Sequence, residues 1–479
     1  MSLLMSTNSR PSREEKGTRR QLPTALLSGL VIALALTPLS AQTTATRATA
    51  RAARPANTPA SGGPVHEPVR LSLVSSSDDV MDQLTQFPVT LLKGSVRTNT
   101  YLVEALPGTT GGVLDDLIDD LVQLPGMLVA EIDQRVFTHE IDSCIDDGMG
   151  GVTQVGAQQC TVAFVDGTPT PPEFFAQTAL EQIDAANAQL IMTTYTPVVA
   201  VIDTGLDMSH SIFAGHLASA GWDFVAGRPR AWDLPNGLDD DGDDLIDEAY
   251  GHGTHIAGTV LAVAPEALIL PVRVLDAEGN GSAYDVANGI FWAVANGADI
   301  INLSLSMSGV SNTVAGALQF AEANNVVVFT SAGNTGDDIL FPGTYDPATI
   351  NYVLPGLEGV ALDGAEIVTV AAVDDMDIKA MFSAWGLEVD VSAPGVAVYS
   401  ALPGDRYGWW SGTSMATAVA SGVAALTVGI AGPFPASSPA QMVIDQSLPI
   451  DDINPMTAGG LGAGRTDALA SAMAAVQGL

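Results

Sequence analysis

The sequence predicts an α/β fold: a parallel β-sheet covered by helices on both faces, preceded by a small α/β domain. After residue 174, short runs of Val, Ile and Ala alternate with longer segments of helical periodicity, which is typical of parallel strands joined by crossover helices. These runs are continuously apolar, as expected of strands buried on both faces. Upstream, a separate strand–helix–strand pattern has its own apolar residues and predicts the smaller domain.

Residues 1–41 have the pattern of a signal peptide. Arg19 and Arg20 end a basic stretch, an apolar run from Leu22 to Leu39 follows, and a small residue, Ala41, comes next. Prolines near both ends of the run leave an uninterrupted apolar segment that is short for a membrane span. We therefore expect export and cleavage, with an uncleaved membrane anchor as the alternative.

Residues 42–68 are expected to be a disordered linker. They consist largely of Ala, Thr, Arg and Pro, which bury too little apolar surface to offset the entropy cost of ordering. Residues 141–173 form a second junction, rich in Gly and Asp, that contains Cys144 and Cys160. In an exported protein such a pair favours a local disulfide, and two free thiols in a mobile segment are the alternative.

The small domain is expected over residues 69–140. A helix is predicted at 113–124, where apolar residues recur at helical spacing opposite a face of aspartates. Apolar segments at 87–96 and 98–106 predict two strands before the helix, and the segment at 126–137 predicts one after it.

The large domain is expected over residues 174–479. Its strands are predicted by six apolar runs, at 197–203, 267–275, 298–306, 325–333, 366–373 and 389–395. Helical patterns occupy 282–296 and 310–324. Asp203 and Asn334 stand at or just after the carboxyl ends of their runs, where catalytic residues of parallel sheets gather.

The charge balance excludes one class of partner. The net charge is −36, from 54 acidic and 18 basic residues. A protein that tracks a nucleic-acid backbone needs clustered Lys and Arg, so we expect no nucleic-acid partner. Hydrophobic residues make up 47% of the chain, which is ample for a large core.

Three short segments carry a complete set of groups for nucleophilic catalysis: VIDTG around Asp203, GHGTH around His252 and GTSMAT around Ser414. A serine hydroxyl needs a base that takes its proton and an acid that orients the base. Ser414 precedes an apolar helical pattern, and the free N–H groups at a helix start favour a developing oxyanion.

These segments in the order Asp…His…Ser, with SAGN ending at Asn334, resemble those of the subtilisin-like serine proteases. The resemblance implies that Ser414 is the nucleophile, His252 the general base and Asp203 the acid that orients it. It also implies that Asn334 and the Ser414 N–H bind the oxyanion, and that peptide bonds are hydrolysed through an acyl-enzyme. The resemblance also predicts that the parallel sheet of the large domain has the subtilisin-like topology, with helices on both faces.

The same resemblance assigns substrate-binding and inhibitory segments. It places Ser304, Leu305, Gly281 and Gly333 along the substrate, and the segment LPGMLVAEIDQRV resembles the end of the family's inhibitory propeptide. The domain at 69–140 is therefore expected to act as an intramolecular inhibitor. The chain departs from the usual family residues at three positions, namely Ser306 instead of Gly, Ala283 instead of a frequent aromatic, and Ala418 instead of Pro.

One acidic loop predicts a metal site. Asp239, Asp241, Asp243 and Asp247 alternate with other residues in a loop shortly before His252. Carboxylates concentrated on one short loop suit Ca²⁺, and their mutual repulsion argues against a loop without a cation. A hydrated acidic surface loop is the alternative.

Together these patterns predict a secreted or otherwise extracytoplasmic serine endopeptidase that acts on polypeptides and is controlled by its own propeptide. Two alternatives remain. One is a membrane-anchored processing protease, in which the N-terminal apolar run is retained. The other is a binding protein that keeps the fold without catalysing a reaction.

Overall fold

The structure is a computed structural model that describes residues 68–77, 79–95, 98–138, 144–146, 152–154, 171–239, 246–307, 309, 311–336, 367–433 and 438–478. The predicted signal peptide and all but the last residue of the predicted linker lie outside these residues. So do Cys160 and the side chain of Cys144, and with them the predicted disulfide.

The small domain is an antiparallel sheet with two helices, in the strand order β2-β3-β1-β4. Its elements are β1 (Arg70–Ser75), α2 (Val80–Leu84), β2 (Val89–Ser95), β3 (Thr100–Ala105), α3 (Gly112–Val122) and β4 (Met127–Ile132). Leu117 and Leu121 of α3 pack with Leu71 and Leu73 of β1 and Tyr101 of β3 in a separate hydrophobic core.

The predicted helix and the two strands before it are confirmed in this domain, and the last predicted strand is divided. β4 ends at Ile132, and a separate strand, β5 (Arg135–Phe137), follows after two residues. The division occurs because β4 pairs with β1, whereas β5 pairs with strands of the large domain. β1 was not predicted.

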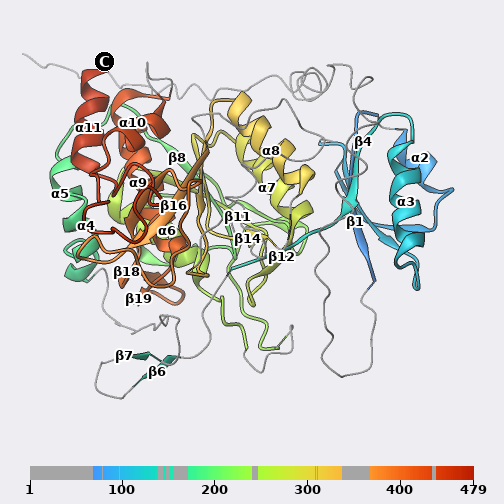
Figure 1. The fold of residues 1–479 in the computed structure, drawn as a ribbon, viewed down its shortest axis with the longest axis horizontal. Helices are drawn as coiled ribbons and strands as arrows, with labels where there is room; N and C mark the ends of the chain where they lie inside the picture. Colours follow the sequence, from blue (N-terminus) through green and yellow to red (C-terminus); the bar gives the residue numbers. More distant parts are fainter. Residues whose placement is uncertain are drawn as a thin grey trace, which may run out of the picture. The chain divides into compact units, whose positions relative to one another are not determined.

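The large domain contains an eight-stranded sheet in the order β10-β9-β11-β8-β13-β15-β16-β17 (Figure 1). Its strands are β8 (Val198–Asp203), β9 (Trp222–Asp223), β10 (Arg228–Pro229), β11 (Leu268–Arg273), β13 (Ile300–Leu303), β15 (Val327–Ser331), β16 (Ile367–Val373) and β17 (Val391–Pro394). All pairs are parallel except β9 with β10. The six predicted strands are confirmed, and the predicted parallel sheet has one antiparallel strand at its edge.

Helices cover the sheet, as predicted (Figure 1). α7 (Ala283–Ala295) and α8 (Asn312–Ala323) pack on each other, while α6 (His252–Val263) packs on α9 (Thr413–Ala431). α10 (Pro439–Asp445) and α11 (Ala468–Gln477) pack on α9 in turn. The remaining helical elements are short: η3 (Pro172–Phe174), α4 (Thr178–Gln182), α5 (Ala185–Ala188) and η4 (Ser211–Phe213).

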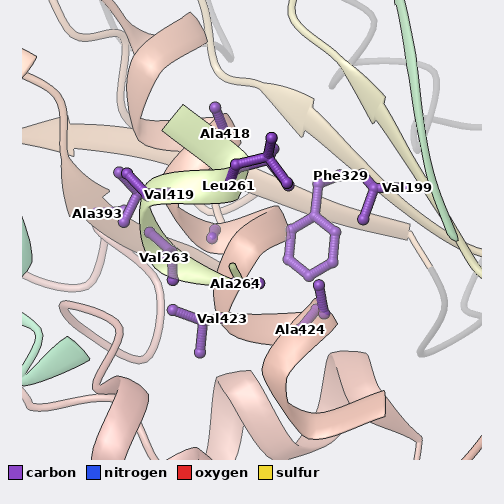
Figure 2. Packing of buried hydrophobic residues seen from close by; sticks show 14 of the residues in the cluster. Val199, Leu261, Val263, Ala264, Phe329, Ala393, Ala418, Val419, Val423 and Ala424 are labelled. Atoms are coloured by element: carbon purple, nitrogen blue, oxygen red, sulfur yellow. The ribbon is translucent and has the colours of Figure 1, made fainter. Parts of the chain in front are cut away.

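α6 and α9 approach closely because the residues between them are small. A Cβ at Gly422 would lie 2.6 Å from Cβ of Val263, so only glycine fits there. Ala418, at the position where the family resemblance implies Pro, is fully buried within α9, and Figure 2 places it with Val419 and Leu261 in the main core. Among the described residues, α9 is also the one helix that is long and apolar enough to cross a membrane, but 94% of its apolar window is buried.

Candidate active site

Asp203 is the last residue of β8 and is completely buried. Its Oδ1 accepts hydrogen bonds from the N–H of Thr204 at 2.7 Å and from Nδ1 of His252 at 2.7 Å. The carboxylate therefore selects the imidazole tautomer that carries its proton on Nδ1. Nε2 of His252 is left as the basic nitrogen.

His252 begins α6, directly after Gly251, which has a φ of +103°. Gly253 allows the start of this helix to lie against the loop after β8, because a Cβ there would be 2.2 Å from the carbonyl oxygen of Gly205. The imidazole of His252 lies over the indole of Trp410, with ring centroids 5.9 Å apart. Close packing thus fixes the ring against Asp203.

His255, one turn later, has a structural role. Its ring stacks on Trp410 at 5.0 Å, and its Nε2 is 3.1 Å from the carbonyl oxygen of Val398. Burial lowers the pKa of His255 to about 3, so the ring is neutral and Nε2–H donates to this carbonyl. Trp410 therefore holds both imidazoles, a contact that the sequence reasoning missed.

Ser414 lies in the first turn of α9, where the N–H groups of a helix have no intrahelical acceptor. The residue is 8% exposed. Its carbonyl oxygen accepts a hydrogen bond from Oγ of Ser304 at 3.0 Å, and Asn302 donates in turn to Ser304 at 2.8 Å. The predicted substrate-binding residue Ser304 is thus in direct contact with the predicted nucleophile.

Asn334 lies beside the start of the same helix. Its Oδ1 accepts hydrogen bonds from the N–H and the hydroxyl of Thr413, both at 2.9 Å. A backbone N–H can only donate, so the amide NH₂ must occupy the other side of the side chain, beside Gly412. Gly333 also contacts this turn, since its N–H donates to the Thr413 hydroxyl at 3.2 Å.

The sheet topology explains why residues so distant in sequence meet. Asp203, Ser304 and Asn334 follow or end β8, β13 and β15, which are neighbours in the sheet. Their carboxyl ends therefore share one edge, and α9 begins at that edge with Ser414. An acid–imidazole pair, a hydroxyl and an amide donor are the groups needed for acyl transfer.

A strand of the small domain lies beside this edge. β5 is inserted between β12 (Asn280–Ser282) and β14 (Ser306–Met307) and pairs antiparallel with both. Val136 lies opposite Gly281 and Met307, and the N–H of Thr138 donates to the carbonyl oxygen of Gly279 at 2.9 Å. Gly281, a predicted substrate-binding residue, is thus paired with an extended segment of the chain.

Ser306 and Leu305 are both buried next to this segment. Ser306 pairs through its backbone with Phe137, and the carbonyl oxygen of Leu305 accepts from the hydroxyl of Ser331 at 3.3 Å. Ala283, the third family departure, is the first residue of α7 and is completely buried.

Carboxylates of the small domain bind helix starts of the large domain, which the sequence reasoning also missed. Glu131 of β4 accepts five hydrogen bonds from Ser311, Asn312 and Thr313 at the start of α8. Asp133 accepts a hydrogen bond from the N–H of Tyr284, near the start of α7, at 3.0 Å. A cation of the small domain adds to these contacts, since Lys93 of β2 forms an ion pair with Asp285 of α7 at 2.7 Å.

The predicted metal loop is described only in part, since Asp241 and Asp243 lie outside the described residues. Asp239 is exposed, and Asp247 accepts hydrogen bonds from the N–H groups of Asn236 and Gly237, both at 2.7 Å. In the described part of the chain, no three His, Cys, Asp or Glu side chains gather around a point that could hold a metal ion. In the described part of the loop, the Asp247 carboxylate therefore holds the backbone at Asn236 and Gly237 in a turn.

Comparison with known proteins assigns the family. The model of the subtilase family matches residues 195–449, more than half of the chain. Thermitase of Thermoactinomyces vulgaris is 35% identical over 271 residues, which cover 54% of this chain and 85% of that protein. The chain belongs to the subtilase family. The large domain described above is therefore a subtilase domain.

Other proteins match in sequence or in fold over different shares of their own length. A thermophilic serine proteinase of Bacillus sp. (strain AK1) is 37% identical over 238 residues, 48% of this chain but only 51% of that protein. A solved protease of Pseudoalteromonas arctica is 29% identical with a TM-score of 0.54, over 64% of this chain and 99% of that chain. Fervidolysin of Fervidobacterium pennivorans, at 22% identity and a TM-score of 0.60 over 85% of this chain and 61% of its own, shares the fold.

Proposed function

We propose that this subtilase is a serine endopeptidase that hydrolyses polypeptides through an acyl-enzyme. Ser414 attacks the scissile carbonyl while Nε2 of His252 takes its proton, and Asp203 stabilises the resulting imidazolium. The 2.7 Å contact between Asp203 and His252, at the same sheet edge as Ser414, carries the proposal.

Asn334 and the N–H of Ser414 are the proposed donors to the oxyanion. The hydrogen bonds of Thr413 to Oδ1 of Asn334 support this role, because they fix the side chain with its amide NH₂ directed toward Gly412 at the start of α9. A preorganised donor does not have to reorient when charge develops, which is the main source of its catalytic effect.

A fluorophosphonate probe tests the proposal, because it reacts only with an activated serine. We expect labelling of Ser414 in the folded protein after removal of residues 69–140, and no labelling of Ser414→Ala or His252→Ala. A folded protein that does not react, and that still binds an extended peptide, would instead support the non-catalytic binding protein.

We also propose that the domain at 69–140 inhibits the enzyme before cleavage. β5 supports this proposal, since it occupies the space between β12 and β14 that an extended substrate needs. Added to the mature enzyme, the separate domain should inhibit peptide hydrolysis competitively. Inhibition that does not change the KM for the peptide would contradict this mode.

Two further proposals concern the environment of the enzyme. We propose that it is exported, and N-terminal sequencing of the exported form distinguishes a cleaved signal from a membrane anchor. We propose that Ca²⁺ binds at the loop of Asp239, Asp241, Asp243 and Asp247, supported by their hard oxygen ligands. A chelator should then lower the melting temperature, and an unchanged melting temperature would leave a hydrated acidic loop.

A further inference from the structure

A second buried carboxyl group lies behind the Asp203–His252 pair. Asp233 is only 3% exposed and follows the β9–β10 hairpin. Its Oδ2 accepts hydrogen bonds from the N–H of Gly251 at 3.0 Å, the hydroxyl of Thr254 at 3.2 Å and the hydroxyl of Thr204 at 3.4 Å. One oxygen thus contacts both the segment that follows Asp203 and the turn that contains His252.

The backbone of Asp233 is fixed as well. Its N–H donates to the carbonyl oxygen of Leu206 at 3.2 Å. A Cβ at Gly205 would lie 2.7 Å from the Asp233 nitrogen, so this approach requires glycine. Asp233 therefore cannot move away from the pair without disturbing the loop that follows β8.

The other oxygen of Asp233 has no partner in the described part of the molecule. Oδ1 is buried without a hydrogen bond, and Asp233 forms no ion pair with a described residue. The guanidinium of Arg273 donates instead to the carbonyl oxygen of Thr204 at 2.9 Å and to Asp223 at 3.3 Å. Arg273 is therefore only a weak stabilising charge for the Asp233 carboxylate.

The ionisable groups that interact with Asp233 come from three segments. They are Asp203 of β8, Arg273 of β11 and Tyr250 of the loop before α6, and Asp207 interacts with Tyr250 in turn. Burial, and then the charge of Asp203, raises the pKa of Asp233 to about 7, whereas the hydrogen bonds from Thr254 and Gly251 oppose this effect. The group therefore changes charge in the range where a histidine base also titrates.

We propose that Asp233 is a positioning residue that ties the loop of Asp203 to the helix of His252 and adds a negative charge that adjusts the basicity of His252. This inference rests on the proposed peptidase function. The ionised carboxylate favours the imidazolium, so it raises the pH at which His252 becomes a free base. The same charge stabilises the imidazolium that forms in the transition state.

Asp233→Asn tests this role because it removes the charge and keeps the shape. A single charge near an ionisable group in a partly screened interior shifts the pKa of that group by about half a unit. This corresponds to about a threefold change in its protonation equilibrium. We expect the acid limb of the kcat/KM profile to move down by about half a pH unit, with a plateau kcat about threefold lower and an unchanged KM.

Asp390→Asn is the matched control. Asp390 is half-buried, accepts a hydrogen bond from the backbone N–H of Thr369 at 2.7 Å and has a pKa raised to about 6 by burial. It stands directly before β17, at the amino end of a parallel strand and thus at the sheet edge opposite the active site. Its replacement should leave the pH profile where it is.

A titration of the His252 imidazole by NMR, in the Ser414→Ala background, separates this inference from the proposed function. A lower His252 pKa in Asp233→Asn supports the inference even if the enzyme hydrolyses no peptide. An unchanged His252 pKa overturns it, as does a kcat that falls equally at every pH without a shift of the acid limb. Absence of fluorophosphonate labelling in the wild type, in contrast, refutes the peptidase proposal alone.

Discussion

Glu131 offers a direct way to loosen the contact between the two domains. Its two carboxylate oxygens accept five hydrogen bonds at 2.8–3.0 Å from Ser311 and the first two residues of α8, so one side chain binds three consecutive residues at the helix start. Two of the donors are backbone N–H groups, of Asn312 and Thr313. Glu131→Gln replaces one oxygen by an NH₂ group that faces donors instead of accepting from them.

The expected loss follows from these bonds. A hydrogen bond to a charged group contributes about 1.5–3 kcal/mol, and a charge at a helix N-terminus adds roughly 0.5 kcal/mol. Glu131 is only half-buried, so solvent screens part of this energy. We therefore expect Glu131→Gln to weaken the contact by about 2 kcal/mol, or roughly 30-fold in the opening equilibrium.

Hydrogen exchange in the Ser414→Ala chain measures this opening without self-cleavage. The N–H of Thr138, which bonds to Gly279, should exchange about 30-fold faster in Glu131→Gln than in the parent. Glu104→Gln, on β3 of the same sheet, is the control, because Glu104 forms no hydrogen bond or ion pair with a described residue of α8. Equal exchange rates in Glu131→Gln and the control would refute the assignment of Glu131 as the helix cap that holds the domains together.

Three other substitutions test separate features. Asn334→Ala should lower kcat by about 10²–10³ with little change in KM, because it removes a proposed oxyanion donor, and a change confined to KM would contradict that role. Gly253→Ala places a Cβ 2.2 Å from the Gly205 carbonyl, so thermal unfolding should show a loss of roughly 1–3 kcal/mol, and an unchanged melting temperature would show that the close approach is unnecessary. Burial raises the pKa of Asp133 to about 6, so its stabilising effect is complete below pH ~4 and is lost as the pH rises through ~6. Melting temperatures of the Ser414→Ala chain should follow that trend, and Asp133→Asn should flatten it.

The sequence predicts the main sheet well, because each of its long strands is a continuous apolar run buried on both faces. β1 was missed because serine alternates with its apolar residues, and such a pattern also fits exposed segments. The helix predicted at 310–324 starts at Asn312, since the Ser311 hydroxyl accepts from the N–H of Val314 at 3.3 Å and caps it. Such boundaries depend on single hydrogen bonds.

The residues of the candidate site also fall into two groups, those that the sequence predicts and those that only the fold brings together. Asp203, His252, Asn334 and Ser414 stand in short motifs whose neighbours, mainly glycines, are also needed for the local geometry. Asp233 is a single carboxylate with no motif around it, and its importance follows only from the contacts that the fold creates. The insertion of β5 depends on a pairing across more than a hundred residues, which no local pattern encodes.

In the proposed mature enzyme, which lacks the small domain, the space left by β5 between two strands would limit which substrates are cut. Adjacent strands lie about 4.8 Å apart, so removal of β5 leaves two unpaired edges separated by about 10 Å, the width of one extended chain. A substrate helix or paired strand has already used its backbone groups and must open before it enters. Each ~1.4 kcal/mol of local unfolding energy in a target protein should therefore slow its cleavage about tenfold. Thus, among targets with similar side chains, the enzyme would rank cleavage sites by how easily each segment unfolds.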